Sequence, residues 1–138
     1  MRIGNSIIGT MELTPAQAEL FHRPNWGVLA TLMEDGSPQA TILWVDERDG
    51  MIWVNTAEGR TKPRNVRRDP RVAITVWDRD QPLRWVQVRG RVEEITRDGA
   101  AEHINFLSHK YDREDFSMPA GQTRVIFKIR PEHVSSSV

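Results

Sequence analysis

The chain has 138 residues, and its 19 basic and 19 acidic side chains give a formal net charge of zero, which offers no support for a nucleic-acid-binding protein. It contains no cysteine, which excludes disulfides, thiolate nucleophiles and thiolate metal sites. The apolar stretch near the N-terminus is too short for a signal peptide or a membrane span, so we expect a cytoplasmic protein without membrane contact.

We expect one domain over residues 12–134, because a chain of this length usually forms a single core and no repeat or linker divides it. Residues 1–11 read as an N-terminal extension, since Met11 could serve as a second start. The serine-rich residues 135–138 read as a loose C-terminal tail.

The first predicted helix begins at Pro15. Thr14 suits the N-cap, proline suits the first helical position, and Gln17 occupies the capping-box position. The helix is expected to end at about Arg23, before a Pro-Asn pair.

Apolar runs then predict strands at 26–33, 38–46, 51–56, 71–78, 83–95 and 123–129. Asp35-Gly36 is a strong hairpin signal between the first two strands. Alternation along the second strand places Gln39 and Thr41 on one face. Gly90 marks a bulge or bend in the fifth strand.

A second long helix, over 97–110, is expected to be capped by Thr96. Together these elements predict a mainly β (α+β) protein: a six-stranded antiparallel barrel with flanking helices.

The most informative stretch is 58–71, which carries six basic and two acidic side chains between two predicted strands. Pro63 predicts the first position of a short helix that ends at Asp69, before another proline. Arg60, Thr61 and Lys62 therefore lie at a helix N-terminus, where free backbone N–H groups and a partial positive charge favour a phosphate. The alternative is an ordinary solvated face of a charged helix.

The sequence indicates no catalytic residue and no metal site. It has no Gly-x-Ser-x-Gly elbow, no GxGxxG and no P-loop, and its four histidines lack a metal-ligand spacing. Each histidine is expected at the surface. The carboxylates fall mostly in turns and helices, so no buried acid–base pair is expected. If the protein is an enzyme, it takes its chemistry from a cofactor.

The run from Gly59 to Ala73 resembles the signature of the pyridoxamine-phosphate-oxidase-like split-barrel proteins. It is most similar to the flavin/deazaflavin oxidoreductases that use coenzyme F-420. The resemblance covers about residues 12–134. It implies an FMN-binding type of split barrel that forms a homodimer, with two cofactor sites in grooves between the subunits.

The resemblance also implies which residues contact the cofactor. The phosphate would be held by Arg60, Thr61, Lys62, Arg64 and Asn65. The ribityl chain and ring would lie along Asn55, Thr56 and Ala57, with Gln39 and Thr41 lining the ring's groove and Trp77 and Trp85 directed toward the dimer groove.

F-420 and FMN each carry a phosphate, and the oligoglutamate tail of F-420 gives further arginines, such as Arg64 and Arg67, a reason to be near. We therefore expect an F-420-dependent reductase that transfers a hydride to an unsaturated small molecule: a quinone, a tetrapyrrole or a conjugated lactone. The alternatives are an FMN-dependent oxidase or reductase, a non-catalytic cofactor carrier, and a nucleic-acid-binding barrel that uses the basic helix and exposed tryptophans.

Overall fold

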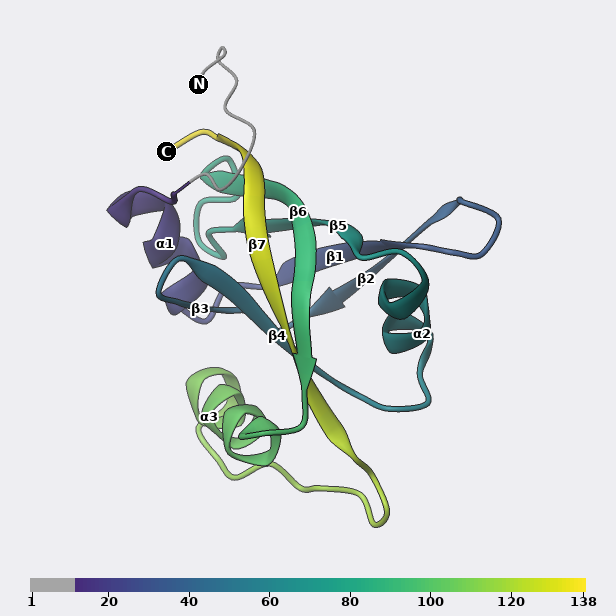
Figure 1. The fold of residues 1–138 in the computed structure, drawn as a ribbon. Coiled ribbons are helices and arrows are strands. Elements are labelled where there is room, and N and C mark those ends of the chain that lie inside the picture. Colours follow the sequence, from purple (N-terminus) through teal and green to yellow (C-terminus); the bar gives the residue numbers. More distant parts are fainter. Residues whose placement is uncertain (1–11) are drawn as a thin grey trace.

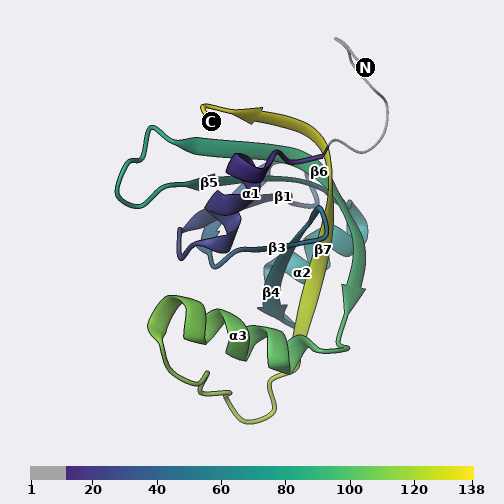
Figure 2. The same ribbon diagram turned by 90° about the vertical axis from the view of Figure 1, so that its left-hand side faces the viewer.

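A computed structural model describes residues 12–138, which form a seven-stranded antiparallel sheet and three helices (Figures 1 and 2). The strand order is β2-β1-β5-β6-β7-β4-β3, and the sheet curves into a barrel that does not close. The elements are α1 (Pro15–His22), β1 (Gly27–Leu32), β2 (Pro38–Leu43), β3 (Asp46–Arg48), β4 (Met51–Ala57), α2 (Thr61–Arg68), β5 (Arg71–Trp77), β6 (Trp85–Thr96), α3 (Ala100–Asp112) and β7 (Arg124–Ser136).

This architecture confirms the predicted mainly β split barrel with flanking helices. Helix α1 packs against β3, β5 and β6, α2 against β1 and β4, and α3 against β7 and β4. No helix within residues 12–138 is long and apolar enough to cross a membrane. The predicted extension at 1–11 lies outside the described residues. Thr14 and Gln17 form the expected capping box of α1.

The strand count is seven rather than six because the second predicted strand divides. Strand β2 ends at Leu43, and residues 46–48 form the separate edge strand β3, which pairs with β4. Between them, Val45 donates its N–H to the Tyr111 hydroxyl at 3.0 Å and accepts from Lys110 Nζ at 2.6 Å. The backbone of Val45 is thus bonded to α3, which accounts for the interruption.

The C-terminal tail predicted at 135–138 is wrong, because β7 continues to Ser136. Ser135 and Ser136 pair with Gln87 and Val86 of β6. The predicted last strand ended at residue 129, two residues before Pro131, and proline cannot donate to a ladder. In the structure Pro131 lies opposite Gly90, where the β6–β7 register shifts, and bulges tolerate proline. The predicted irregularity at Gly90 is therefore confirmed.

Helix α3 begins later than predicted. Its N-cap is Gly99, which adopts φ +73° and has no side chain to cap the helix. Thr96 instead accepts a hydrogen bond from the N–H of Asp98. A local turn between the strand and the helix therefore uses the hydroxyl that the sequence assigned to capping.

The sheet has an inner face that packs into the core and an outer face that is only partly covered. Inner-facing residues include Leu29, Ile74, Val88 and Phe127, all fully buried. Along β2 the predicted alternation is confirmed: Gln39, Thr41 and Leu43 are half-buried, whereas the intervening positions are exposed.

The C-terminal part of α3 is held by buried polar contacts. Lys110 Nζ donates to the carbonyls of Phe21 and Val45, each at 2.6 Å, and the Tyr111 hydroxyl donates to Asn25 O at 2.5 Å. Burial lowers the pKa of Lys110 to about 8, against the opposing effect of the Asp46 charge. Burial raises the pKa of Tyr111.

We expect the titration of Lys110 to raise the free energy of unfolding as the pH increases from 8 to 10. In that interval the unfolded chain keeps the lysine proton, at a pKa of about 10.4, whereas the folded chain releases it, so the free energy of unfolding rises with pH. The rise should be about 1–2 kcal/mol relative to a Lys110→Met variant. Urea unfolding of both proteins at several pH values measures it; parallel pH profiles would contradict it. Above pH 10, ionisation of Tyr111 in the unfolded chain acts in the opposite direction.

Candidate anion-binding site

The predicted basic helix is present, but it begins earlier than the sequence indicated. Helix α2 starts at Thr61, so Pro63 is its third residue rather than its first. The missing N–H still belongs to the first turn, where it has no intrahelical partner. Arg60 is the N-cap, in an extended conformation, and makes no side-chain cap hydrogen bond. The helix ends before Asp69, as predicted.

Two basic residues of the stretch pair with its two acids, and a third is bonded to a backbone carbonyl of β1. Arg67 forms a bidentate pair with Glu58, at 2.7 and 2.8 Å. Arg71 pairs with Asp69 at 2.6 Å. Arg68 donates to Leu32 O at 3.2 Å. All three lie toward or beyond the C-terminal end of α2, so both acids of the stretch pair with cations from that end.

The cations at the N-terminal end of α2 have no carboxylate partner within residues 12–138. Lys62 Nζ donates to Thr41 Oγ1 at 3.0 Å, and Arg64 Nη1 donates to Gly59 O at 2.8 Å. Burial lowers the pKa of Lys62, and the charge of Arg60 lowers it further. Uncompensated positive charge therefore lies beside the partial positive charge of a helix N-terminus, which is an arrangement suited to an anion.

A fourth cation, Arg124, reaches this region from the start of β7. It is 8% exposed, lies opposite Ala57 of β4, and donates to the side-chain oxygens of Asn55 at 2.9 Å and Gln122 at 3.0 Å. Burial and the charge of Arg60 lower its pKa to about 10. No local sequence signal marks Arg124, because only the β4–β7 register brings it to the end of β4.

Two of the predicted cofactor contacts have side chains engaged by the fold. The Asn55 amide donates to Ala100 O at 3.0 Å and bonds His103 Nδ1 at 3.1 Å. Asn65 is buried and donates to Thr31 Oγ1 at 2.9 Å, which ties α2 to β1. The amides of both asparagines are thus bonded within the chain, and their contact with a cofactor stays a prediction.

Of the remaining predicted residues, three lie on the inner face of the sheet, and Trp77 lies elsewhere. Thr41 and Gln39 lie on the inner face of β2, and Thr41 touches Lys62. Thr56 is buried on the inner side of β4, and its hydroxyl has no hydrogen-bond partner in the described part of the chain. Trp77 is not brought to this site within one chain: it pairs with Trp85 at the end of β5 remote from α2.

A buried acid–histidine pair corrects two further predictions. His103 is 2% exposed rather than at the surface, and its Nε2 lies 3.1 Å from Asp46 Oδ2, which is also buried. Burial acts to raise the pKa of Asp46, but the hydrogen bond with His103 and the charge of Arg48 outweigh it, so the pKa is lowered. The pair connects to the anion site through Asn55, which bonds both His103 and Arg124.

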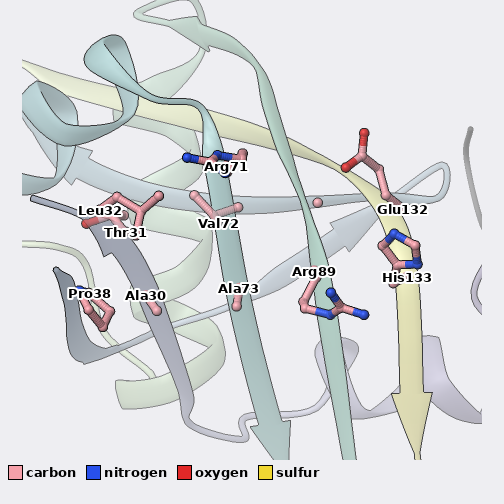
Figure 3. Close-up of a pocket in the computed structure, with 11 residues that line it drawn as sticks. Ala30, Thr31, Leu32, Pro38, Arg71, Val72, Ala73, Arg89, Glu132 and His133 are labelled. Atoms are coloured by element: carbon pink, nitrogen blue, oxygen red, sulfur yellow. The ribbon is translucent and has the colours of Figure 1, made fainter. Parts of the chain in front are cut away.

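The outer face of the sheet carries a shallow cavity of about 390 Å³ (Figure 3). Its floor includes small residues from neighbouring strands, since Ala30 of β1 lies opposite Ala73 of β5 and Ala73 lies opposite Arg89 of β6. Arg89 in turn lies opposite His133 of β7 at the cavity's edge. The small side chains leave room for another surface to approach this face closely.

Comparison with known proteins identifies relatives of this arrangement. Residues 13–137 match the family described as pyridoxamine 5′-phosphate oxidase. The solved structure of an F-420 reductase is 33% identical, with a TM-score of 0.79, and the match covers 89% of this chain and 98% of that one.

Two other solved structures are similar. A conserved hypothetical protein from Mycobacterium tuberculosis is 28% identical, with a TM-score of 0.67, over 92% of this chain and 84% of its own. An FAD-binding protein from Mesorhizobium loti is 25% identical, with a TM-score of 0.63, over 88% of this chain and 92% of its own.

Proposed function

Because the chain belongs to the pyridoxamine 5′-phosphate oxidase family and has an oxidoreductase-like split barrel, we propose that it is a reductase dependent on coenzyme F-420, with FMN as the alternative cofactor. The observation that carries the proposal is the pair of cations, Arg60 and Lys62, at the N-terminus of α2 without a carboxylate partner in the described residues.

The residues present fit a phosphate-bearing cofactor. Arg60 and Lys62 supply charge-assisted donors, and the backbone N–H of Thr61 belongs to the unbonded first turn of α2. Thr41 and Gln39, on the inner face of β2, would lie along the chain that joins phosphate to ring, together with Ala57 at the end of β4.

The choice of F-420 over FMN rests on two further observations. Arg64 has only a carbonyl partner, so its charge is available to the acidic tail that distinguishes F-420. Arg67, the other arginine predicted to lie near the tail, is paired with Glu58, so we do not assign it to the tail. The 33% identity to an F-420 reductase points the same way.

When bound, the cofactor would supply hydride-transfer chemistry toward an unsaturated acceptor such as a quinone, a tetrapyrrole or a conjugated lactone. The protein's own contribution is to fix the phosphate at Arg60 and Lys62, orient the ring chain along β2 and β4, and exclude water. No side chain is assigned as a proton donor.

We also propose that two copies associate through the outer face of the sheet, with the cofactor sites in the grooves between them. Ala30 and Ala73 permit close approach, and Ile42 on the same face is 63% exposed. Association would bring Trp77 and Trp85 of each protomer toward the groove, although one chain alone leaves Trp77 remote from Lys62.

Light scattering should therefore report twice the chain mass of 15.9 kDa. Ala73→Arg should yield a folded monomer, because a long charged side chain on the alanine floor blocks close packing. Ala101→Arg, on the exposed surface of α3, is the control and should remain a dimer. A monomeric wild-type protein would remove the shared groove.

Turnover tests the proposed reaction. Reduced F-420, mixed anaerobically with the protein and a quinone, biliverdin or a conjugated lactone, should be reoxidised with at least one acceptor faster than without protein. Tight binding of F-420 with no reoxidation by any acceptor class would indicate a cofactor carrier instead.

A further inference from the structure

Arg124 is a buried cation that the fold does not neutralise. Its guanidinium has no carboxylate within ion-pair distance in residues 12–138, although a buried charge normally requires one. Its partners are the amide oxygens of Asn55 and Gln122, and it lies 5.2 Å from the ring centre of Phe116. Elsewhere Arg48, which also lies over aromatic rings, is paired with Asp46.

The hydrogen bonds around Asn55 determine which of its neighbouring atoms donate and which accept. Asn55 Oδ1 accepts from Arg124, so its nitrogen must donate to Ala100 O and to His103 Nδ1. His103 therefore accepts at Nδ1 and donates from Nε2 to Asp46. With its oxygen and both N–H groups engaged, the Asn55 amide cannot flip without losing bonds, and it holds Arg124 in one orientation.

Arg124 lies close to the segment that leads into α2, since it is opposite Ala57 of β4. The N–H of Glu58 bonds to Thr123 O at 2.9 Å, so the beginning of β7 lies against the segment that leads to Arg60. The charge of Arg60 disfavours the charged forms of both Arg124 and Lys62. Arg60 is thus close enough to repel cations from two separate parts of the chain, and an anion beside Arg60 relieves that repulsion.

We propose that Arg124 is a third cationic contact for the cofactor's phosphate or acidic tail, and that Asn55 is the positioning residue that holds it through a neutral acceptor. This inference rests on the proposed function. A carboxylate at position 55 would hold the same guanidinium but neutralise it. An amide orients Arg124 and leaves its charge available to the ligand.

The test uses two ligand pairs: FMN with riboflavin, which differ in the phosphate alone, and F-420 with its phosphate-free deazaflavin riboside, which differ in the phosphate and the acidic tail attached to it. Dissociation constants are measured for wild type, Arg124→Gln and the isosteric Asn55→Asp. Both variants should lose about tenfold or more in affinity for the phosphorylated member, the range for one charge-assisted contact, while the phosphate-free affinity stays within about twofold. Arg48→Gln is the control and should leave the phosphate preference unchanged.

A folded Arg124→Gln or Asn55→Asp variant with the wild-type phosphate preference would overturn the inference. If no ring compound binds the wild type, the proposed function fails separately. Inorganic pyrophosphate then decides the role of Arg124 through thermal unfolding: stabilisation of the wild type that both variants lose supports it, and absent or equal stabilisation in all three overturns it.

Discussion

Replacing Lys62 with alanine should weaken cofactor binding by about 1.5–3 kcal/mol, the usual contribution of a hydrogen bond to a charged group. The Lys62 ammonium is half-buried beside the N-terminus of α2, and it donates a hydrogen bond to the neutral hydroxyl of Thr41. A phosphate would therefore be its first charged partner. Isothermal titration with the cofactor measures the loss.

The same substitution should barely change stability in the absence of cofactor. The lost hydrogen bond to Thr41 is offset because the repulsion between Lys62 and Arg60 disappears with it. Lys128→Ala is the control, since that lysine already pairs with Glu94 at 3.4 Å. Equal cofactor affinity in wild type and Lys62→Ala would show that the phosphate lies elsewhere.

Gly90→Ala should destabilise the protein by about 3 kcal/mol or more, at or above the upper end of the range for overpacking. A Cβ at this position would lie 2.0 Å from the carbonyl oxygen of Arg130 and 3.0 Å from its carbonyl carbon. Both atoms are backbone, so no side-chain rotation relieves the contact. The strands β6 and β7 would have to separate where their register shifts.

Urea unfolding of Gly90→Ala measures this effect. Gly50→Asn is the control: Gly50 has φ +83° with open space around its Cβ position, and asparagine tolerates that conformation. Its free energy of unfolding should change by about 1 kcal/mol or less. If Gly90→Ala were as stable as the control, the close approach of β6 and β7 would not constrain the barrel.

Local sequence signals predicted most of the fold. The capping box of α1, the hairpin at Gly36, the end of α2 before Asp69 and the irregularity at Gly90 each depend on a few neighbouring residues, and each is present. The errors arose where tertiary contacts override local preference. Bonds from α3 divide the second predicted strand, and a bulge accommodates the proline in β7.

The candidate site was predictable only in its local part. Arg60 and Lys62 adjoin a helix start that proline and charge spacing reveal. Arg124 and the His103–Asp46 pair depend on strand register and on the docking of α3, which no local pattern encodes. The motif did not indicate that the fold engages the amides of Asn55 and Asn65 internally, and their contact with a cofactor stays a prediction.

A side-by-side fluorescence titration of the protein with F-420 and FMN tests the central claim most directly. We expect micromolar or tighter binding of F-420 and weaker binding of FMN, with both weakened when inorganic phosphate competes or Lys62 is replaced. Tight FMN binding with weak F-420 binding would move the protein to the FMN-dependent alternative. Binding of neither would contradict the assignment of Arg60 and Lys62 to a cofactor phosphate.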